Sequence, residues 1–238
     1  MSFDLPRDTV LPVEVIDVRL DPAPHPLERD NLPAIEKNWL REIAVNPHIF
    51  DGRVALLSEL SYRDSRLAGR CHIVRYATFM YWLRNRDVLG AGHVFAHAML
   101  VSSDNALVAI RMGKHTINAG RVYFAAGSFE LEDFRDGLVD VDFNMQREVK
   151  EETGIDITQA SPAKRYYLLT TRSGTVIFRR YRMPMTANAM VASINAFVAA
   201  QAHPEIAAPV VIHSAGDLPD GLASHMPPLI EWHFANRG

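Results

Sequence analysis

The chain has 238 residues, of which 48% are hydrophobic and 22% are charged, and its net charge is −3 at pH 7. This composition is ordinary for a globular protein that buries a sizeable core, and it excludes a chain that is disordered throughout. The slightly acidic balance also excludes an overall basic field that would attract nucleic acid, so we expect no nucleic-acid partner.

The single cysteine and the first residues indicate a cytoplasmic protein. Cys71 has no partner for an internal disulfide, which suits a reducing compartment. The opening MSFDLPRDTV lacks the basic and then apolar pattern of a signal peptide. No apolar run reaches the length of a membrane span, so we expect no membrane partner either.

The first 90 residues predict a small α+β module. Its apolar residues, including an aromatic stripe on the second helix, predict that the module packs on the rest of the chain instead of moving freely. We expect extended structure over 1–20, a proline-rich connector over 21–33, a helix over 34–44, strands over 54–60 and 69–76, and a helix over 77–87.

A boundary is expected near Gly90–Gly92, and residues 91–238 then mix strands with helices. Such a mixture favours the α/β (α+β) fold class with a sandwich of layers, because lone strands separated by helices are too few for a doubly wound sheet. We expect hairpins over 93–113 and 165–183, helices over 143–153, 187–202 and 227–234, and a strand over 209–214.

The helix predicted over residues 143–153 crowds three carboxylates, Glu148, Glu151 and Glu152, into five positions. Asp142 is a suitable N-cap for it, and Gly154 fits the left-handed position that ends a helix. Like charges at this spacing repel by a few tenths of a kcal/mol.

A divalent cation would neutralise that repulsion. Carboxylates one helical turn apart offer the hard oxygen ligands that Mg²⁺ and Mn²⁺ prefer. Arg147 stands four residues before Glu151 and is placed to hold that side chain. The alternative is a solvated acidic helix face, which is the usual role of such charge runs.

The order of residues in REVKEETGI, 147–155, resembles the second half of the Nudix hydrolase signature, which reads Arg-Glu-apolar-x-Glu-Glu-x-Gly-apolar. The flanking segments AHAMLVSSDNALVAIR, FAAGSFE and TVIFRRYRM resemble the first strand pair, the strand before the glycine loop and a later sheet strand of that family. The resemblance covers roughly residues 92–238.

One departure concerns the loop that precedes the helix. In the family signature a loop glycine precedes the arginine by fourteen residues, whereas Gly127 precedes Arg147 by twenty, so the loop is six residues longer. Counted back from Arg147, the usual position of the signature's first glutamate holds Val139. The candidates to replace that glutamate are Glu130, Glu132, Asp133, Asp136 and Asp140, and the choice among them stays open.

The resemblance implies a Nudix-type α/β/α sandwich with a mixed sheet over residues 91–238, with residues 1–90 packed on it. It also implies that Glu148 and Glu152 bind Mg²⁺ or Mn²⁺, with the carbonyl of Ala126 as a further ligand. Glu151 would join this site directly or through water, or act in catalysis. Gly127, Arg147 and Gly154 would be structural members of the motif.

The activity implied is that of a pyrophosphohydrolase that cleaves the diphosphate bridge of a nucleoside diphosphate linked to another moiety. A small nucleotide-derived substrate resembling a nucleotide sugar is favoured, because the N-terminal segment resembles those of larger family members. A coenzyme A diphosphatase and a non-catalytic Nudix-fold sensor that binds a nucleotide are the alternatives. A homodimer is left open.

Two arginines and one glutamate outside the signature complete the candidate site. Arg111 and Arg180 are candidates for phosphate contacts, although exposed arginines are more often solubilising charges. The resemblance implies a general base in a loop near the final strand, commonly a glutamate. Glu205 is the candidate, because it is the only carboxylate between Asp156 and Asp217. The alternatives for this role are Asp217, Asp220 or a signature glutamate such as Glu151.

Overall fold

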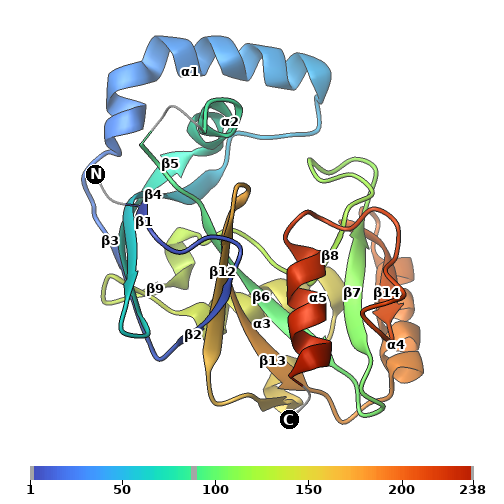
Figure 1. The fold of residues 1–238 in the computed structure, drawn as a ribbon. Helices are drawn as coiled ribbons and strands as arrows, with labels where there is room; N and C mark the ends of the chain where they lie inside the picture. The colour runs from blue at the N-terminus through green and yellow to red at the C-terminus, as the bar shows by residue number, and fades with distance from the viewer. Residues whose placement is uncertain (1–2, 87–89, 237–238) are drawn as a thin grey trace.

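Two mixed β-sheets and five α-helices make up the chain in a computed structural model that describes residues 3–86 and 90–236 (Figure 1). The predicted end of a helix at residue 87 therefore lies outside the described residues, immediately before the boundary expected at Gly90–Gly92. Within the described ranges, no helix combines the length and the apolar character that crossing a membrane requires.

The first sheet is formed mostly by the N-terminal part of the chain, and its strand order is β1-β4-β5-β3-β10-β9. Asp64 and Ser65, both with positive φ, form the tight turn between β4 and β5. The strands are β1 (Phe3–Asp4), β3 (Val15–Leu20), β4 (Arg53–Arg63), β5 (Arg66–Arg75), β9 (Phe134–Arg135) and β10 (Leu138–Val139).

The second sheet has the order β14-β7-β6-β13-β12-β2, with β8 beside β7 and β11 beside β13. Strands β6 and β13 run parallel, and the other neighbouring strands of this sheet pair antiparallel. The strands are β2 (Val10–Val13), β6 (Val94–Val101), β7 (Leu107–Met112), β8 (Val122–Tyr123), β11 (Ser161–Pro162), β12 (Tyr166–Thr171), β13 (Gly174–Arg182) and β14 (Ile206–Ile212).

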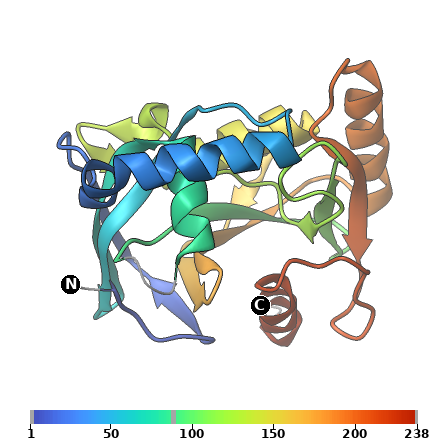
Figure 2. The same ribbon diagram turned by 90° about the horizontal axis from the view of Figure 1, so that it is seen from above.

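Helices cover both faces of the second sheet (Figure 2). Phe178 on β13 contacts Trp232 of α5, whereas Tyr181, on the opposite face of the same strand, contacts Met145 of α3. Helix α4 packs beside α3 and against β14. The helices are α1 (Pro26–Val45), α2 (Tyr76–Arg84), α3 (Val141–Thr153), α4 (Ala187–Ala200) and α5 (Met226–Ala235).

This arrangement confirms the predicted α/β (α+β) fold class and the predicted α/β/α sandwich with a mixed sheet. The predicted hairpins, the helix before the last strand, that strand and the final helix are all present, with ends that differ by a few residues. Differences of that size are expected, because helix and strand ends fray.

The expectation of a connector over residues 21–33 is wrong, because α1 begins at Pro26. The ring of a proline is tolerated at the first helical position, where its missing N–H would have no partner within the helix. The ring of His25 caps this end by accepting from the amide of Leu27 at 3.0 Å. Asn31 departs from helical geometry two residues before Pro33, so the second proline is accommodated by a kink.

Each of the two parts of the chain contributes strands to both sheets. Strand β2, from the N-terminal part, pairs with β12 in the second sheet. Strands β9 and β10, which follow the glycine loop, join the first sheet at β3. One apolar core contains buried residues of both sheets, while a smaller one lies under α1 and α2. The division into a module of residues 1–90 and a domain of residues 91–238 stays a prediction.

Candidate metal and active site

Helix α3 carries the three glutamates, and its ends are fixed by Asp140 and Gly154. The side chain of Asp140 accepts from the amide of Phe143 at 3.0 Å, and Gly154 has a left-handed φ of 71°. The prediction that Asp142 is the N-cap is therefore wrong, while that of Gly154 is confirmed. Asp142 lies in the first turn, where its carboxylate accepts from Arg179 and from the hydroxyl of Tyr181.

The helix presents two of its glutamates to the protein interior. Met145 and Val149 are fully buried in the core beneath α3. Glu148 and Glu152, one helical turn apart, are only 9% and 5% exposed. The side chain of Glu151 is 59% exposed, so it lies at the rim of the site.

The loop before the helix lies directly against these two carboxylates. The amide nitrogen of Ala126, whose carbonyl is the predicted ligand, donates to Oε2 of Glu152 at 3.0 Å. A Cβ atom at Gly127 would lie 1.9 Å from Oε1 of Glu148, a distance that no side chain tolerates. The carboxylate of Glu148 therefore occupies the space that a side chain at position 127 would fill, and it can keep this position only beside a glycine.

Arg147 is the cation that this helix supplies to the acidic cluster. Its guanidinium lies 2.8 Å from a carboxylate oxygen of Glu148 and 3.1 Å from one of Glu151. It also lies 3.0 Å from Asp133 and 3.5 Å from Glu132. The contact expected between Arg147 and Glu151 is present, but one guanidinium is shared among four carboxylates.

Of the five candidates for the first acidic residue, Asp133 is the one that is buried. It is fully buried, contacts Arg147, and accepts from the side-chain amide of Asn144 at 2.9 Å. It stands six residues after Gly127, the same separation that the family signature has between its glycine and its first glutamate. The six extra residues, 134–139, follow Asp133, so counting back from the arginine pointed to Val139.

The surroundings of Glu148 and Glu152 disfavour their charged forms. Burial raises the pKa of Glu148 to about 8, with Arg147 opposing the shift and Glu151 adding to it. Burial also raises the pKa of Glu152 well above its ordinary value, and the negative charge of Glu148 adds to this shift. The amide of Ala126 lowers the pKa of Glu152, but the described residues give this carboxylate no cationic partner within salt-bridge distance.

These two carboxylates fit a divalent cation, whose charge would offset the cost of burying them together. Among residues 3–86 and 90–236, no three histidine, cysteine, aspartate or glutamate side chains converge into a metal-binding group. A cation at Glu148 and Glu152 would therefore draw its remaining ligands from backbone oxygen and water. Mg²⁺ usually retains several waters when one or two carboxylates hold it.

Glu205 lies in the segment before β14, and its side chain is exposed. Its backbone carbonyl accepts from the amide of Gly113 at 2.7 Å, which joins this segment to the loop after β7. The charge of Glu205 contributes to the raised pKa values of Glu152 and Tyr123. The structure thus brings Glu205 into the electrostatic neighbourhood of the signature glutamates.

Tyr123 belongs to the same neighbourhood and is also part of the hydrophobic core. Its ring is buried, and its hydroxyl accepts from the side-chain amide of Asn118 at 3.3 Å. Burial and then the charge of Glu152 raise the pKa of this hydroxyl, so Tyr123 stays protonated and can donate a hydrogen bond.

The two arginines predicted to contact phosphate, Arg111 and Arg180, lie in different parts of the fold. Arg111 donates to the backbone carbonyls of Gly120 and Asp220, at 3.1 and 3.2 Å, so it ties two loops together. Arg180 donates to the carbonyl of Asn236 and lies over the ring of Trp232, on the α5 face of the sheet. The structure does not bring Arg180 together with the glutamates of α3, which lie on the opposite face.

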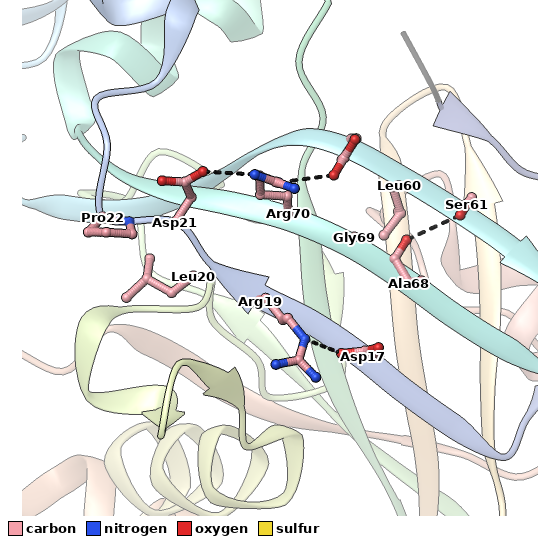
Figure 3. Close-up of a pocket in the computed structure, with 11 residues that line it drawn as sticks. Asp17, Arg19, Leu20, Asp21, Pro22, Leu60, Ser61, Ala68, Gly69 and Arg70 are labelled. Carbon is pink, nitrogen blue, oxygen red and sulfur yellow. Dashed lines mark hydrogen bonds and ion pairs between the residues drawn. The ribbon is translucent and has the colours of Figure 1, made fainter.

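A pocket of about 580 Å³ lies elsewhere, on the exposed face of the first sheet (Figure 3). Its charged residues neutralise one another: Arg70 contacts Asp21 and Glu59, and Arg19 contacts Asp17. The glutamates of α3 are not among the residues that line it. Opposite charges that are already paired leave this pocket without a preference for an anion or a cation.

Comparison with known proteins gives a likeness of fold. No family model matches the sequence, and neither does any curated protein. A MutT protein from Methanosarcina mazei Go1 has 15% identity and a TM-score of 0.39, over 61% of this chain and 94% of that one. NrtR from Shewanella oneidensis has 10% identity and a TM-score of 0.40, over 61% of this chain and 63% of NrtR. DR0079 from Deinococcus radiodurans has 12% identity and a TM-score of 0.37, over 68% of this chain and 83% of DR0079.

Proposed function

We propose that this chain is a metal-dependent hydrolase of the Nudix type, which cleaves the diphosphate bridge of a nucleoside diphosphate linked to another moiety. The observation that carries the proposal is the burial of Glu148 and Glu152 on one face of α3, against the loop at Gly127. A binding protein without metal chemistry has no use for two adjacent carboxylates that burial destabilises. The order of residues in 147–155 supports the same activity.

Glu148, Glu152 and the backbone of Ala126 would hold Mg²⁺ or Mn²⁺. When bound, the metal supplies charge neutralisation on the diphosphate oxygens and a lower pKa for the attacking water. Arg147 keeps Glu148 and Glu151 in fixed orientations through its contacts at 2.8 and 3.1 Å. Exposed Glu151 is placed at the rim, where it can contact the metal's water shell.

Glu205 is the residue that we assign as general base. Its carboxylate is exposed, and its charge adds to the raised pKa of Glu152. Tyr123, which retains its proton, can donate a hydrogen bond to an oxygen of the diphosphate. Glu205 immediately precedes β14 and Tyr123 ends β8, and both of these strands pair with β7.

The favoured substrate is a small nucleotide derivative that resembles a nucleotide sugar. Support comes from the N-terminal part of the chain, because β2 pairs with β12 of the second sheet and β3 pairs with β10 in the first sheet, called the N-terminal sheet below. The resemblance to larger Nudix members, which carry such N-terminal segments, suggests the same substrate class. Coenzyme A and its derivatives are the competing substrates, and the same assay separates them.

The test is hydrolysis of a panel of nucleoside diphosphate compounds, measured with Mg²⁺, with Mn²⁺ and with a chelator. The panel contains nucleotide sugars, dinucleoside diphosphates and coenzyme A. We expect turnover only with a divalent cation, and an order-of-magnitude or greater loss in Glu148→Gln. Glu231→Gln, the same chemical change at an exposed position of α5, is the matched control.

Metal-independent turnover by the wild-type protein would contradict the proposal. Nucleotide binding without turnover of any compound would instead favour a non-catalytic sensor. Isothermal titration with a non-hydrolysable nucleoside diphosphate analogue distinguishes such a sensor from an enzyme whose substrate is absent from the panel.

A further inference from the structure

The six extra residues of the loop before α3, 134–139, form a complete β-hairpin. Strand β9 (Phe134–Arg135) and strand β10 (Leu138–Val139) pair antiparallel, and Asp136 and Gly137 form the turn with φ values of 51° and 76°. Two residues with positive φ are what the tightest hairpin connection requires. The hairpin is closed at its base, where the amide of Asp140 donates to the carbonyl of Asp133 at 2.7 Å.

The hairpin is attached to the N-terminal sheet. Leu138 pairs with Arg19 of β3, and the amide of Leu20 donates to the carbonyl of Gly137 at 2.8 Å. Phe134 and Val139 are buried in the same core as the residues of both sheets. Strand β9 is the edge strand of the N-terminal sheet, with β10 between it and β3, and Figure 1 shows β9 on the same side of the molecule as β3.

The two residues at the base of the hairpin are also the two residues that orient α3. Asp140 caps the helix by accepting from the amide of Phe143. Asp133 contacts Arg147 and Asn144 within the helix, and its carboxylate also accepts from the amide of Glu130 at 2.8 Å. Anything that moves the base of the hairpin therefore moves the start of α3 and the side chain of Arg147.

We propose that β3 of the N-terminal sheet positions the glutamates of α3 through this hairpin. Leu20 and Gly137 are then positioning residues, which act on Glu148 through Asp133 and Arg147. The inference rests on the function proposed above and adds to it a role for the N-terminal sheet in the active site. The sheet does this without contacting substrate.

The alternative, in which the hairpin is a tolerated surface insertion, is at odds with its burial. An insertion in a surface loop costs little and is ordinarily exposed and variable. This one contributes two buried side chains to the core and leaves Asp133 at its base fully buried. A charged group in that position depends on every one of its hydrogen bonds, so small displacements of the hairpin have a large effect on it.

The first test variant removes one link. Leu20→Pro deletes the amide that donates to Gly137 and keeps the extended backbone that a strand residue needs. A second variant replaces residues 134–139 with a Gly-Ser hexapeptide, which keeps the loop length and removes the strand pairing. Val74→Ala is the control. Val74 is buried in the smaller core under α1 and α2, so its truncation destabilises the same sheet at a place away from the hairpin.

Two measurements are made on each variant. Amide hydrogen exchange of the metal-free protein reports on the loop and on α3 without any requirement for turnover. Steady-state kinetics with Mg²⁺ then separates kcat from KM. In Leu20→Pro we expect exchange over 130–152 to be about tenfold faster, and kcat to fall about 10- to 100-fold with KM within about twofold. Val74→Ala, compared with Leu20→Pro under conditions of equal thermal stability, should show neither the faster exchange nor the lower kcat.

Unchanged exchange over 130–152 in both hairpin variants, with the fold verified by circular dichroism, would overturn the inference. So would loss of kcat in Val74→Ala equal to that in Leu20→Pro, because general destabilisation would then explain it. If the wild-type protein shows no metal-dependent hydrolysis, the proposed function fails. The exchange data then still decide whether the sheet restrains α3.

Discussion

Gly127 and Glu148 compete for the same space, since a Cβ atom on Gly127 would lie 1.9 Å from Oε1 of Glu148. The glycine therefore allows a carboxylate on α3 to lie flat against the loop that precedes the helix. A side chain at position 127 would force the carboxylate of Glu148 to move. This relationship explains in steric terms why the motif combines a glycine loop with a glutamate helix.

Gly127→Ala is expected to displace Glu148 and to lower kcat by about 10²-fold, because a shift near 1 Å is enough to misplace a catalytic group. The fold should survive, since the new methyl group meets a side chain and not backbone. Gly216→Ala is the control, because its Cβ would meet nothing closer than Ser214 Oγ at 3.9 Å. A Gly127→Ala enzyme with wild-type kcat and Mg²⁺ dependence would show that Glu148 does not act from this position.

Glu152→Gln is expected to change stability and activity in opposite directions. The glutamine can still accept from the amide of Ala126, while the buried charge is gone, so the metal-free protein should be more stable by roughly 1–3 kcal/mol at pH 8. Turnover should fall by orders of magnitude because a metal ligand has lost its charge. Urea unfolding without metal and kinetics with metal check the two halves separately. A variant that is less stable and fully active would contradict both.

The stability of the metal-free protein should fall as pH rises from about 4.5 to 8. The pKa of Glu148 is raised to about 8 by burial, against 4.5 when unfolded, so within this window the folded chain binds more protons than the unfolded chain. Unfolding free energy therefore decreases with pH, and Glu152 acts in the same direction. Saturating Mg²⁺ should raise the melting temperature by more at pH 8 than at pH 5.5.

Melting curves at both pH values, with Mg²⁺ and with chelator, measure this difference. The matched control is Glu148→Gln, in which the pH dependence of the metal effect should shrink. A Mg²⁺ effect of equal size at both pH values would argue against metal binding by buried carboxylates.

Asp133 and Arg147 are expected to be strongly coupled in stability. Arg147→Ala leaves the fully buried Asp133 without its cation, which costs about 3–5 kcal/mol. Removing both charges in Asp133→Asn with Arg147→Ala should recover part of this loss. A double-mutant cycle from urea unfolding gives the coupling energy, and a value near zero would contradict the contact. The earlier expectation, that Arg147 acts mainly by restraining Glu151, would then regain support.

Local patterns in the sequence predicted the parts of the site that depend on local geometry. Glu148 and Glu152 share a face because they lie one helical turn apart, and Gly154 ends the helix because it adopts positive φ readily. The cap was misplaced by two residues because Asp140 and Asp142 are equally good capping side chains. Only the contact of Asp142 with Arg179, which is distant in sequence, decides between them.

Long-range pairing explains what the sequence did not predict. Strand β2 joins the second sheet and strand β10 joins the first, and no periodicity within either segment specifies its partner strand. Asp133 could not be chosen from its neighbours for the same reason. The position of the six-residue insertion is known only once residues 134–139 are seen to close on themselves and attach to β3.

Glu205→Gln is expected to separate proton transfer from substrate binding. The carboxylate is exposed, and its charge reaches Glu152, so it can accept a proton from water beside the buried glutamates. Its loss should lower kcat by about 10²–10⁴-fold, leave KM nearly unchanged, and remove the acidic limb of the pH–rate profile. Asp217→Asn and Asp220→Asn are the matched controls, and each should keep that limb. If Glu205→Gln keeps the limb and a near-normal rate, the base is whichever of Asp217, Asp220 or Glu151 abolishes the limb when it is replaced by its amide.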